Sequence, residues 1–134
     1  MSLTRSKAEV TALKTAEEFK NAVQKMSQTK VVVIDLHEEW CGANVAIMQF
    51  YTQMWLEFPE PDNRIQLYSI SKEIPELNDT LKLLCPTVKA AAQGCKPLFL
   101  VFRLGTLMEA VDGVNAPALK SVIATNVPKL APKE

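Results

Sequence analysis

The chain has 134 residues, 48% of them hydrophobic, and it carries 15 basic and 15 acidic side chains. This balance gives no electrostatic reason to expect nucleic acid or a membrane as a partner. The length fits one domain with its own core, so we predict a single domain over 1–134 with a core from about 8 to 127. No apolar run is long enough to span a bilayer, and the polar N-terminus predicts no signal peptide.

The first half of the chain alternates between predicted strands and helices. Residues 8–13 predict a short strand, and residues 15–27 predict a helix whose capping box pairs Thr15 with Glu18. Residues 31–36 are apolar and β-branched, which is typical of a central strand covered on both faces. This part of the chain therefore predicts parallel strands joined by a helical crossover.

A second helix is predicted over residues 43–58, and it is apolar over more than half of its circumference. A helix that covers one face of a sheet usually keeps a polar outer stripe. Two interpretations remain open for this helix. Part of its surface is buried beneath a neighbouring helix, or part of it contacts another protein.

The second half of the chain adds a hairpin to this pattern. The predicted elements, in order, are a loop at 59–63, a strand at 65–70, a helix at 74–84, a helix-prone segment at 87–94, a strand at 98–103, its hairpin partner at 107–111, a helix at 115–126 and a frayed tail at 127–134. The order predicts an α/β fold with a mixed central sheet, parallel in part and closed by a C-terminal antiparallel hairpin, with helices on both faces.

A cysteine lies between the central strand and the second helix. The sequence there is Trp40-Cys41-Gly42-Ala43-Asn44. A thiol at a helix N-terminus lies where backbone N–H groups favour the thiolate. In an intracellular α/β protein this turn usually carries Cys-x-x-Cys, a dithiol that reduces disulfides. Here Asn44 occupies the fourth position, so Cys41 is a candidate nucleophile without its usual partner.

These motifs, in this order, resemble the thioredoxin family. The run from residue 33 to 42 is similar to the family's approach to its active site, with Asp35 at the family's buried aspartate and Trp40 at its flanking tryptophan. Pro97 matches the family's cis-proline, and Gly113 matches the glycine after its last strand. The resemblance covers about residues 8–127 and implies the thioredoxin fold.

Two shorter segments show a narrower resemblance. Residues 94–102 and 111–119 are similar to the thioredoxin-like light chains of ciliary outer-arm dynein, and to thioredoxin domains joined to nucleoside-diphosphate-kinase-like domains. The features are Cys95, two residues before Pro97, and a Gly-x-Asn-Ala-Pro start to the last helix. This resemblance implies a structural role in the axoneme of a cilium or flagellum. It also implies dynein heavy or intermediate chains, and other light chains, as partners.

The chain also departs from the family pattern. Asn44 replaces the resolving cysteine, Ala43 replaces the usual proline, the segment 84–93 is longer, and no lysine lies in the strand 65–70. Disulfide reduction needs two sulfurs, because the second thiolate attacks the mixed disulfide formed by the first. We therefore predict a docking light chain that is not a full disulfide reductase. The alternatives are a monothiol redox protein or sensor that acts through Cys41, and a chaperone-like assembly factor.

The thioredoxin resemblance also implies a peptide-binding groove beside the cysteine. Its predicted lining is Trp40, Gly42, Ala43, Asn44, Lys96 and Pro97. Cys95 is a possible second thiol for Cys41. Asp35, deprived of its role at a second sulfur, is interpreted as an inherited, hydrogen-bonded core carboxyl.

The remaining thiol and imidazole are given structural interpretations. Cys85 reads as a small apolar residue. His37 has no ligand partners at metal spacing, so we expect no metal and no cofactor. Three cysteines, an odd number, predict free thiols in a reducing compartment, so we expect the cytoplasm and the axoneme as the setting.

Overall fold

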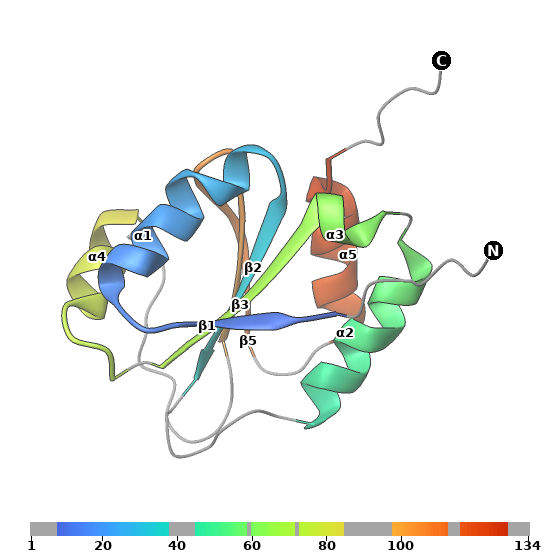
Figure 1. The fold of residues 1–134 in the computed structure, drawn as a ribbon, viewed down its shortest axis with the longest axis horizontal. Coiled ribbons are helices and arrows are strands. Elements are labelled where there is room, and N and C mark those ends of the chain that lie inside the picture. The colour runs from blue at the N-terminus through green and yellow to red at the C-terminus, as the bar shows by residue number, and fades with distance from the viewer. Residues whose placement is uncertain are drawn as a thin grey trace.

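A computed structural model describes residues 8–37, 45–58, 60–71, 73–84, 98–112 and 116–128. The chain forms one five-stranded sheet with helices on both faces, so the predicted mixed α/β architecture is confirmed (Figure 1). The strand order across the sheet is β1 (Val10–Leu13), β3 (Ile65–Ser71), β2 (Val31–His37), β4 (Leu98–Arg103) and β5 (Thr106–Asp112).

Strand β2 lies at the centre of this sheet. It runs parallel to β3, which is parallel to β1, and antiparallel to β4, which forms the hairpin with β5. Leu36 of β2 pairs with Leu98 of β4, so β2 ends at the edge of the sheet where β4 begins. The segment 38–44, which follows β2, and the segment that ends at residue 97 are therefore joined to neighbouring strand ends.

The helices divide into two pairs. Helices α1 (Ala16–Gln24) and α4 (Leu77–Leu84) cover one face of the sheet, and α2 (Val45–Glu57) and α5 (Ala116–Asn126) cover the other (Figure 1). A short 3₁₀ helix, η1 (Met26–Gln28), follows α1, and a four-residue helix, α3 (Pro61–Arg64), precedes β3.

Each helix pair buries its own apolar layer against the sheet. The layer beneath α1 and α4 consists of Leu13, Phe19, Ala22, Val23, Val32, Ile34, Leu36, Tyr68, Ile70, Leu77, Leu81, Leu98, Leu100 and Phe102. The layer beneath α2 and α5 consists of Val31, Val33, Ile47, Tyr51, Met54, Trp55, Ile65, Leu67, Phe99, Val101, Val111, Leu119 and Ile123. Side chains alternate along β2, so Asp35 lies on the same face as Val31 and Val33.

The start of α1 follows the prediction and its end does not. The Glu18 N–H donates to Thr15 Oγ1 at 3.0 Å, which is the first bond of a capping box. The Glu18 carboxylate accepts from the Lys14 N–H at 3.5 Å, one residue before the N-cap. The α-helix ends at Gln24, and 3₁₀ turns follow, so the expected single helix over 15–27 was wrong at its C-terminus. The buried Ser27 hydroxyl donates to the Val23 carbonyl, which holds this tighter turn in place.

Three other boundaries need correction. Residues 61–64 form the helix α3 where a loop was expected, because Pro61 suits a first helical position. The helix expected from residue 74 begins at Leu77, because Glu76 has a φ of 66° that no α-helix accepts. The tail was expected to fray from residue 127, but a hydrogen bond fixes its start. Arg64 Nε donates to the Pro128 carbonyl at 2.8 Å. Residues 87–94 lie outside the described residues.

The β4–β5 turn is fastened to the end of η1. The N–H groups of Leu104 and Gly105 donate to the carbonyl and to the hydroxyl of Ser27, each at 2.7 Å. Arg103 Nη1 donates to the carbonyls of Ser27 and Gln28 at 2.7 and 2.9 Å. Ser27 therefore connects two segments that lie more than 70 residues apart in the sequence.

Candidate functional site

Most of the predicted site residues lie outside the described part of the chain. These are Trp40, Cys41, Gly42, Ala43, Asn44, Cys85, Cys95, Lys96 and Pro97, and the side chain of His37 is also outside it. Their roles, the Cys41–Cys95 pairing and the groove that they line stay predictions. The structure describes the parts of the chain that adjoin these residues in the sequence, namely Asp35, the ends of strands β2 and β4, and helix α2.

Asp35 is buried near the end of the central strand. Its residue is 8% exposed, and its neighbours across the sheet are Ser69 in β3 and Phe99 in β4. It lies on the α2/α5 side, where the buried layer is mostly apolar and includes the phenol of Tyr51 and the indole of Trp55. Burying a carboxyl in such surroundings costs several kcal/mol, on the order of 2–7, unless polar groups compensate it. The burial of Asp35 is thus established, while its correspondence to the family's aspartate stays a prediction.

The phenol is that of Tyr51, which reaches this layer from α2. Tyr51 is fully buried, and its hydroxyl has no hydrogen-bond partner among the residues that the structure describes. Burial raises the pKa of Tyr51 well above its usual value, and the negative charge of Asp35 raises it further. Both groups are buried on the α2/α5 side of the sheet, near enough for the carboxylate to act on the phenol.

Sequence reasoning placed Tyr51 among the apolar residues of the helix and missed this pairing. The available signal was the presence of a tyrosine among the buried positions of α2. A buried tyrosine, unlike a phenylalanine, brings a hydroxyl that needs a polar neighbour. The distance along the chain between Asp35 and Tyr51 gave no such signal. Only the packing of α2 on the sheet shows that the Asp35 carboxyl and the Tyr51 phenol are buried on the same side.

This arrangement can hold a proton but cannot by itself attack a disulfide. Every cysteine of the chain lies outside the described residues. In the part of the chain that the structure describes, no group of three His, Cys, Asp or Glu side chains is placed to hold a metal ion. Within the same part, every helix is too short or too polar to cross a membrane.

A second feature lies on the outside of the same side of the sheet. Helices α2 and α5 border a groove of about 350 Å³, lined by Phe50, Gln53, Met54, Glu57, Pro117 and Lys120. Lys120 Nζ and Glu57 Oε2 form an ion pair at its rim. Of the two interpretations of α2, burial accounts for Ile47, Tyr51, Met54 and Trp55, while Leu56 remains 60% exposed.

The fold defines a thioredoxin-like protein. The crystal structure of thioredoxin from Malassezia sympodialis superposes with a TM-score of 0.64 at 21% identity, over 94% of this chain and 96% of that one. The five-stranded mixed sheet and its two helix pairs are therefore those of the thioredoxin fold.

Sequence similarity then shows the family. Thioredoxin-1 of Saccharomyces cerevisiae is 30% identical over 117 residues, which is 87% of this chain and 98% of the relative. The chain belongs to the thioredoxin family. The 14 kDa light chain of the flagellar outer-arm dynein of Chlamydomonas reinhardtii is 26% identical over 91 residues, or 68% of this chain and 61% of that relative. No protein-family model matches the chain.

Proposed function

We propose that this protein is a thioredoxin-like structural and docking light chain of an axonemal outer-arm dynein, and not a full disulfide reductase. The observation that carries the proposal is a thioredoxin frame in which Asn44 stands where the second thiol belongs. The likeness to the Chlamydomonas dynein light chain supports the choice of complex. A fold that keeps its frame while its chemistry changes is well suited to binding.

The chemistry of the turn supports the same conclusion. Cys41 thiolate can attack a client disulfide, which forms a mixed disulfide and releases the other client sulfur as a thiolate. Release of the client requires a second thiolate to attack that mixed disulfide. The Asn44 amide cannot do this, so turnover would depend on Cys95 or on an external thiol such as glutathione.

The partners in this proposal are dynein heavy or intermediate chains, within the axoneme or the cytoplasm from which it is assembled. The docking surface would be the groove predicted around Trp40, Lys96 and Pro97, together with the exposed part of α2. We expect this surface to adjoin the end of β2, the start of β4 and the start of α2 at Val45, because the predicted residues follow or precede these ends in the sequence.

One observation favours a second candidate, a monothiol redox protein. Asp35 and Tyr51 keep a buried titratable pair beneath the strand end that leads to Cys41. Buried polar groups cost stability, and such groups cluster at sites of chemistry. In this reading Cys41 forms mixed disulfides with clients or glutathione, and the pair holds a proton nearby.

An affinity purification separates the two candidates. The tagged wild type, Cys41→Ser and the control Cys85→Ser are expressed in ciliated cells, and each eluate is compared with and without reductant by mass spectrometry. We expect dynein chains to be retained by all three proteins in reductant. Loss of these partners with Cys41→Ser, or with reductant alone, would overturn the docking proposal in favour of the redox protein.

A gain-of-function variant tests the chemistry directly. We expect the wild type to show no catalysis of insulin disulfide reduction above the dithiothreitol background. Asn44→Cys restores the second thiol and should gain that activity, while Asn44→Ser, of similar size and without an attacking thiolate, should not. Wild-type turnover equal to that of Asn44→Cys would contradict the claim that Asn44 removes reductase activity.

A further inference from the structure

The turn between β4 and β5 holds a leucine in a backbone conformation that leucine rarely adopts. Arg103 and Thr106 pair across the hairpin, so its loop consists of the two residues Leu104 and Gly105. Their φ angles are 55° and 77°, both positive as in a type I′ turn. Asparagine and glycine take such angles readily, whereas a bulky side chain at positive φ is an outlier. The choice of leucine here therefore needs a reason other than the turn itself.

Packing within the chain does not supply that reason. Leu104 is 61% exposed and belongs to neither buried layer of the sheet. Leu107, in the same hairpin, does pack against the layer beneath α1 and α4. Residues in sparsely populated backbone conformations persist only where the surrounding structure holds them, and they cluster at functional sites. Leu104 therefore has the properties of a residue retained for contact with another molecule.

Hydrogen bonds hold this turn in one position. The N–H groups of Leu104 and Gly105 both donate to Ser27, each at 2.7 Å, and Arg103 Nη1 donates to the Ser27 carbonyl at 2.7 Å. A side chain that is already fixed in place loses little conformational entropy on binding. We call the turn, residues 103–106, together with the adjoining segment 25–30, the hairpin tip.

The hairpin tip is basic, although the charges of the whole chain balance. It carries Lys25, Lys30 and Arg103 and no acidic side chain. Lys30 Nζ donates to Gln66 Oε1 at 3.3 Å, and the Arg103 guanidinium donates to backbone carbonyls. These acceptors are neutral, so the bonds leave the positive charges uncompensated. The surface that complements the hairpin tip is therefore acidic.

We propose that the hairpin tip binds a partner protein at an apolar pocket bordered by acidic side chains, and that Leu104 enters this pocket. A few anchor residues in desolvated pockets carry most of the binding energy of an interface, and complementary charges around them fix the register. One leucine buries too little apolar area to hold the chain on a membrane, so the observations favour a protein pocket.

The hairpin tip and the predicted peptide groove belong to opposite ends of the sheet. Strands β2 and β4 are antiparallel, with Val32 paired to Phe102 and Leu36 paired to Leu98. The turn after β4 therefore lies beside the start of β2, whereas the groove predicted around Trp40 follows the end of β2 in the sequence. Figure 1 shows this turn at the end of the sheet opposite the start of α2. The contact is thus distinct from the docking surface of the proposed function.

Photocrosslinking at position 104 tests the contact directly. The full chain with p-benzoylphenylalanine in place of Leu104 is expressed in ciliated cells and irradiated, and the crosslinked peptides are sequenced by mass spectrometry. We expect one partner segment in which apolar residues are flanked by aspartate or glutamate. The same replacement of Leu83, which is 71% exposed on α4, is the matched control and should not reach that segment. No protein crosslink, a segment without acidic residues, or identical crosslinks from both positions would overturn the proposal.

Substitution of the anchor measures its contribution. Leu104→Asn suits the positive φ and removes the apolar side chain, so this variant should unfold in urea at the same concentration as the wild type or a higher one. Its affinity for the crosslinked segment, prepared as a peptide and measured by calorimetry, should fall roughly tenfold or more, while Leu83→Asn binds as the wild type does. Lys25→Glu should weaken binding and reduce its dependence on salt.

Two results with these variants would contradict the proposal. Equal binding by Leu104→Asn and the wild type would show that the leucine is not the anchor. Unfolding of Leu104→Asn at a lower urea concentration would show that the leucine serves the fold instead. Binding of the wild type, but not of Leu104→Asn, to phosphatidylserine vesicles would assign the hairpin tip to a membrane and overturn the protein pocket.

The crosslinked partner also separates this contact from the proposed function. An acidic and apolar segment of a dynein chain would support both, and such a segment in another protein would support this contact alone. Retention of dynein chains without any crosslink from position 104 would overturn this contact and leave the proposed function standing.

Discussion

Each side of the sheet is covered by a pair of helices, but the two sides differ in their surface charges and in their buried polar groups. On the α1/α4 side, acidic and basic side chains cover the outside of the helices, and the buried polar group Ser27 is fully hydrogen-bonded. On the α2/α5 side, the outer surface keeps one ion pair, and the interior buries Asp35 and Tyr51. The apolar layers beneath the two pairs are alike in their residue types.

The difference lies in how each side of the sheet accommodates its buried polar groups and its surface charges. On the α1/α4 side, the charged helix surfaces favour contact with water, and the buried polar group beneath them is hydrogen-bonded. On the α2/α5 side, a buried phenol without a hydrogen-bond partner in the described residues costs stability. This cost lies on the side that also buries the carboxyl of Asp35.

The largest expected effect is on the α1/α4 side. Phe19 is fully buried and packs edge-to-face against Phe102, with ring centroids 6.1 Å apart. Phe19→Ala should lower the free energy of unfolding by about 3–5 kcal/mol, because it removes apolar contact and leaves a cavity. Urea denaturation followed by circular dichroism measures this. A loss below about 1 kcal/mol would mean that this side is not the stabilising one.

The next effect tests the satisfied polar group. Ser27→Ala removes the hydroxyl that donates to the Val23 carbonyl and accepts from the Gly105 N–H. The buried groups left without partners should cost about 1–3 kcal/mol of stability. Ser121→Ala, at an exposed position of α5, is the control and should change stability by less than about 0.5 kcal/mol. Equal effects of the two variants would contradict the role of Ser27.

A smaller effect tests the unsatisfied group on the other side. Tyr51→Phe removes a buried hydroxyl, so at pH 7 stability should be unchanged or higher by up to about 1 kcal/mol. The pKa of Tyr51 is raised in the folded protein, so the folded state holds its proton more tightly than the unfolded chain does. Its contribution is complete below the unfolded pKa of 10.0 and is lost as the pH rises above it.

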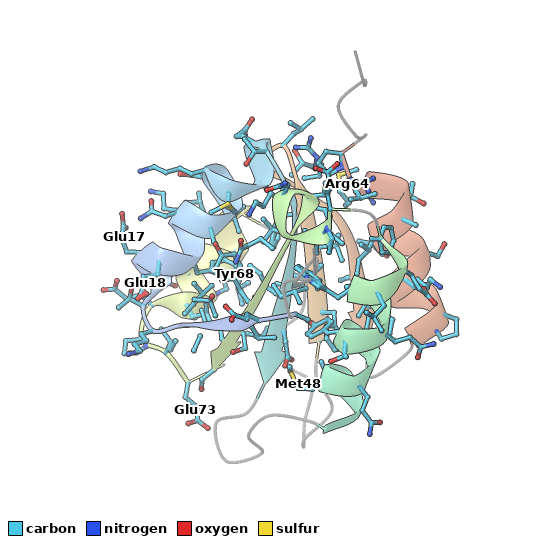
Figure 2. The ribbon with its side chains drawn as sticks, turned by 45° about the vertical axis from the view of Figure 1, so that its right-hand side comes forward. Glu17, Glu18, Met48, Arg64, Tyr68 and Glu73 are labelled. Atoms are coloured by element: carbon cyan, nitrogen blue, oxygen red, sulfur yellow. The ribbon has the colours of Figure 1, made fainter. Side chains whose placement is uncertain are left out.

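The wild type should therefore lose stability above pH 10 at up to about 1.4 kcal/mol per pH unit more than Tyr51→Phe does. Urea titrations at several alkaline pH values measure the difference. Tyr68→Phe is the matched control on the α1/α4 side, because burial also raises the pKa of Tyr68. Figure 2 shows Tyr68 on that side of the sheet. Each variant should remove only the part of the stability loss above pH 10 that comes from its own tyrosine.

The smallest effect concerns the ion pair at the rim of the groove. The Lys120 and Glu57 side chains are 48% and 40% exposed, so solvent screens their attraction. Glu57→Gln should change the free energy of unfolding by less than about 1 kcal/mol. A larger loss in urea denaturation would show that the pair holds α2 and α5 together.

Local sequence predicted much of the fold. The apolar β-branched run of β2 and the Thr15–Glu18 cap are local signals, and both are confirmed. The short helix at Pro61 and the early end of α1 were missed, because a single turn depends on contacts such as that of Arg64 with Pro128. Cys41, Asn44 and Pro97 lie outside the described residues, so the site that they form stays a prediction.

The sequence by itself determined most of the strands and helices, the family to which they belong, and the presence of Asn44 three residues after Cys41. These follow from periodicity, capping residues and motif order, which act over a few residues at a time. Only the tertiary structure decided that Tyr51 is buried on the same side as Asp35, that Ser27 holds the β4–β5 turn, and that Glu57 and Lys120 neutralise one face. Each of these joins distant residues, and their proximity is set by the packing of helices on the sheet.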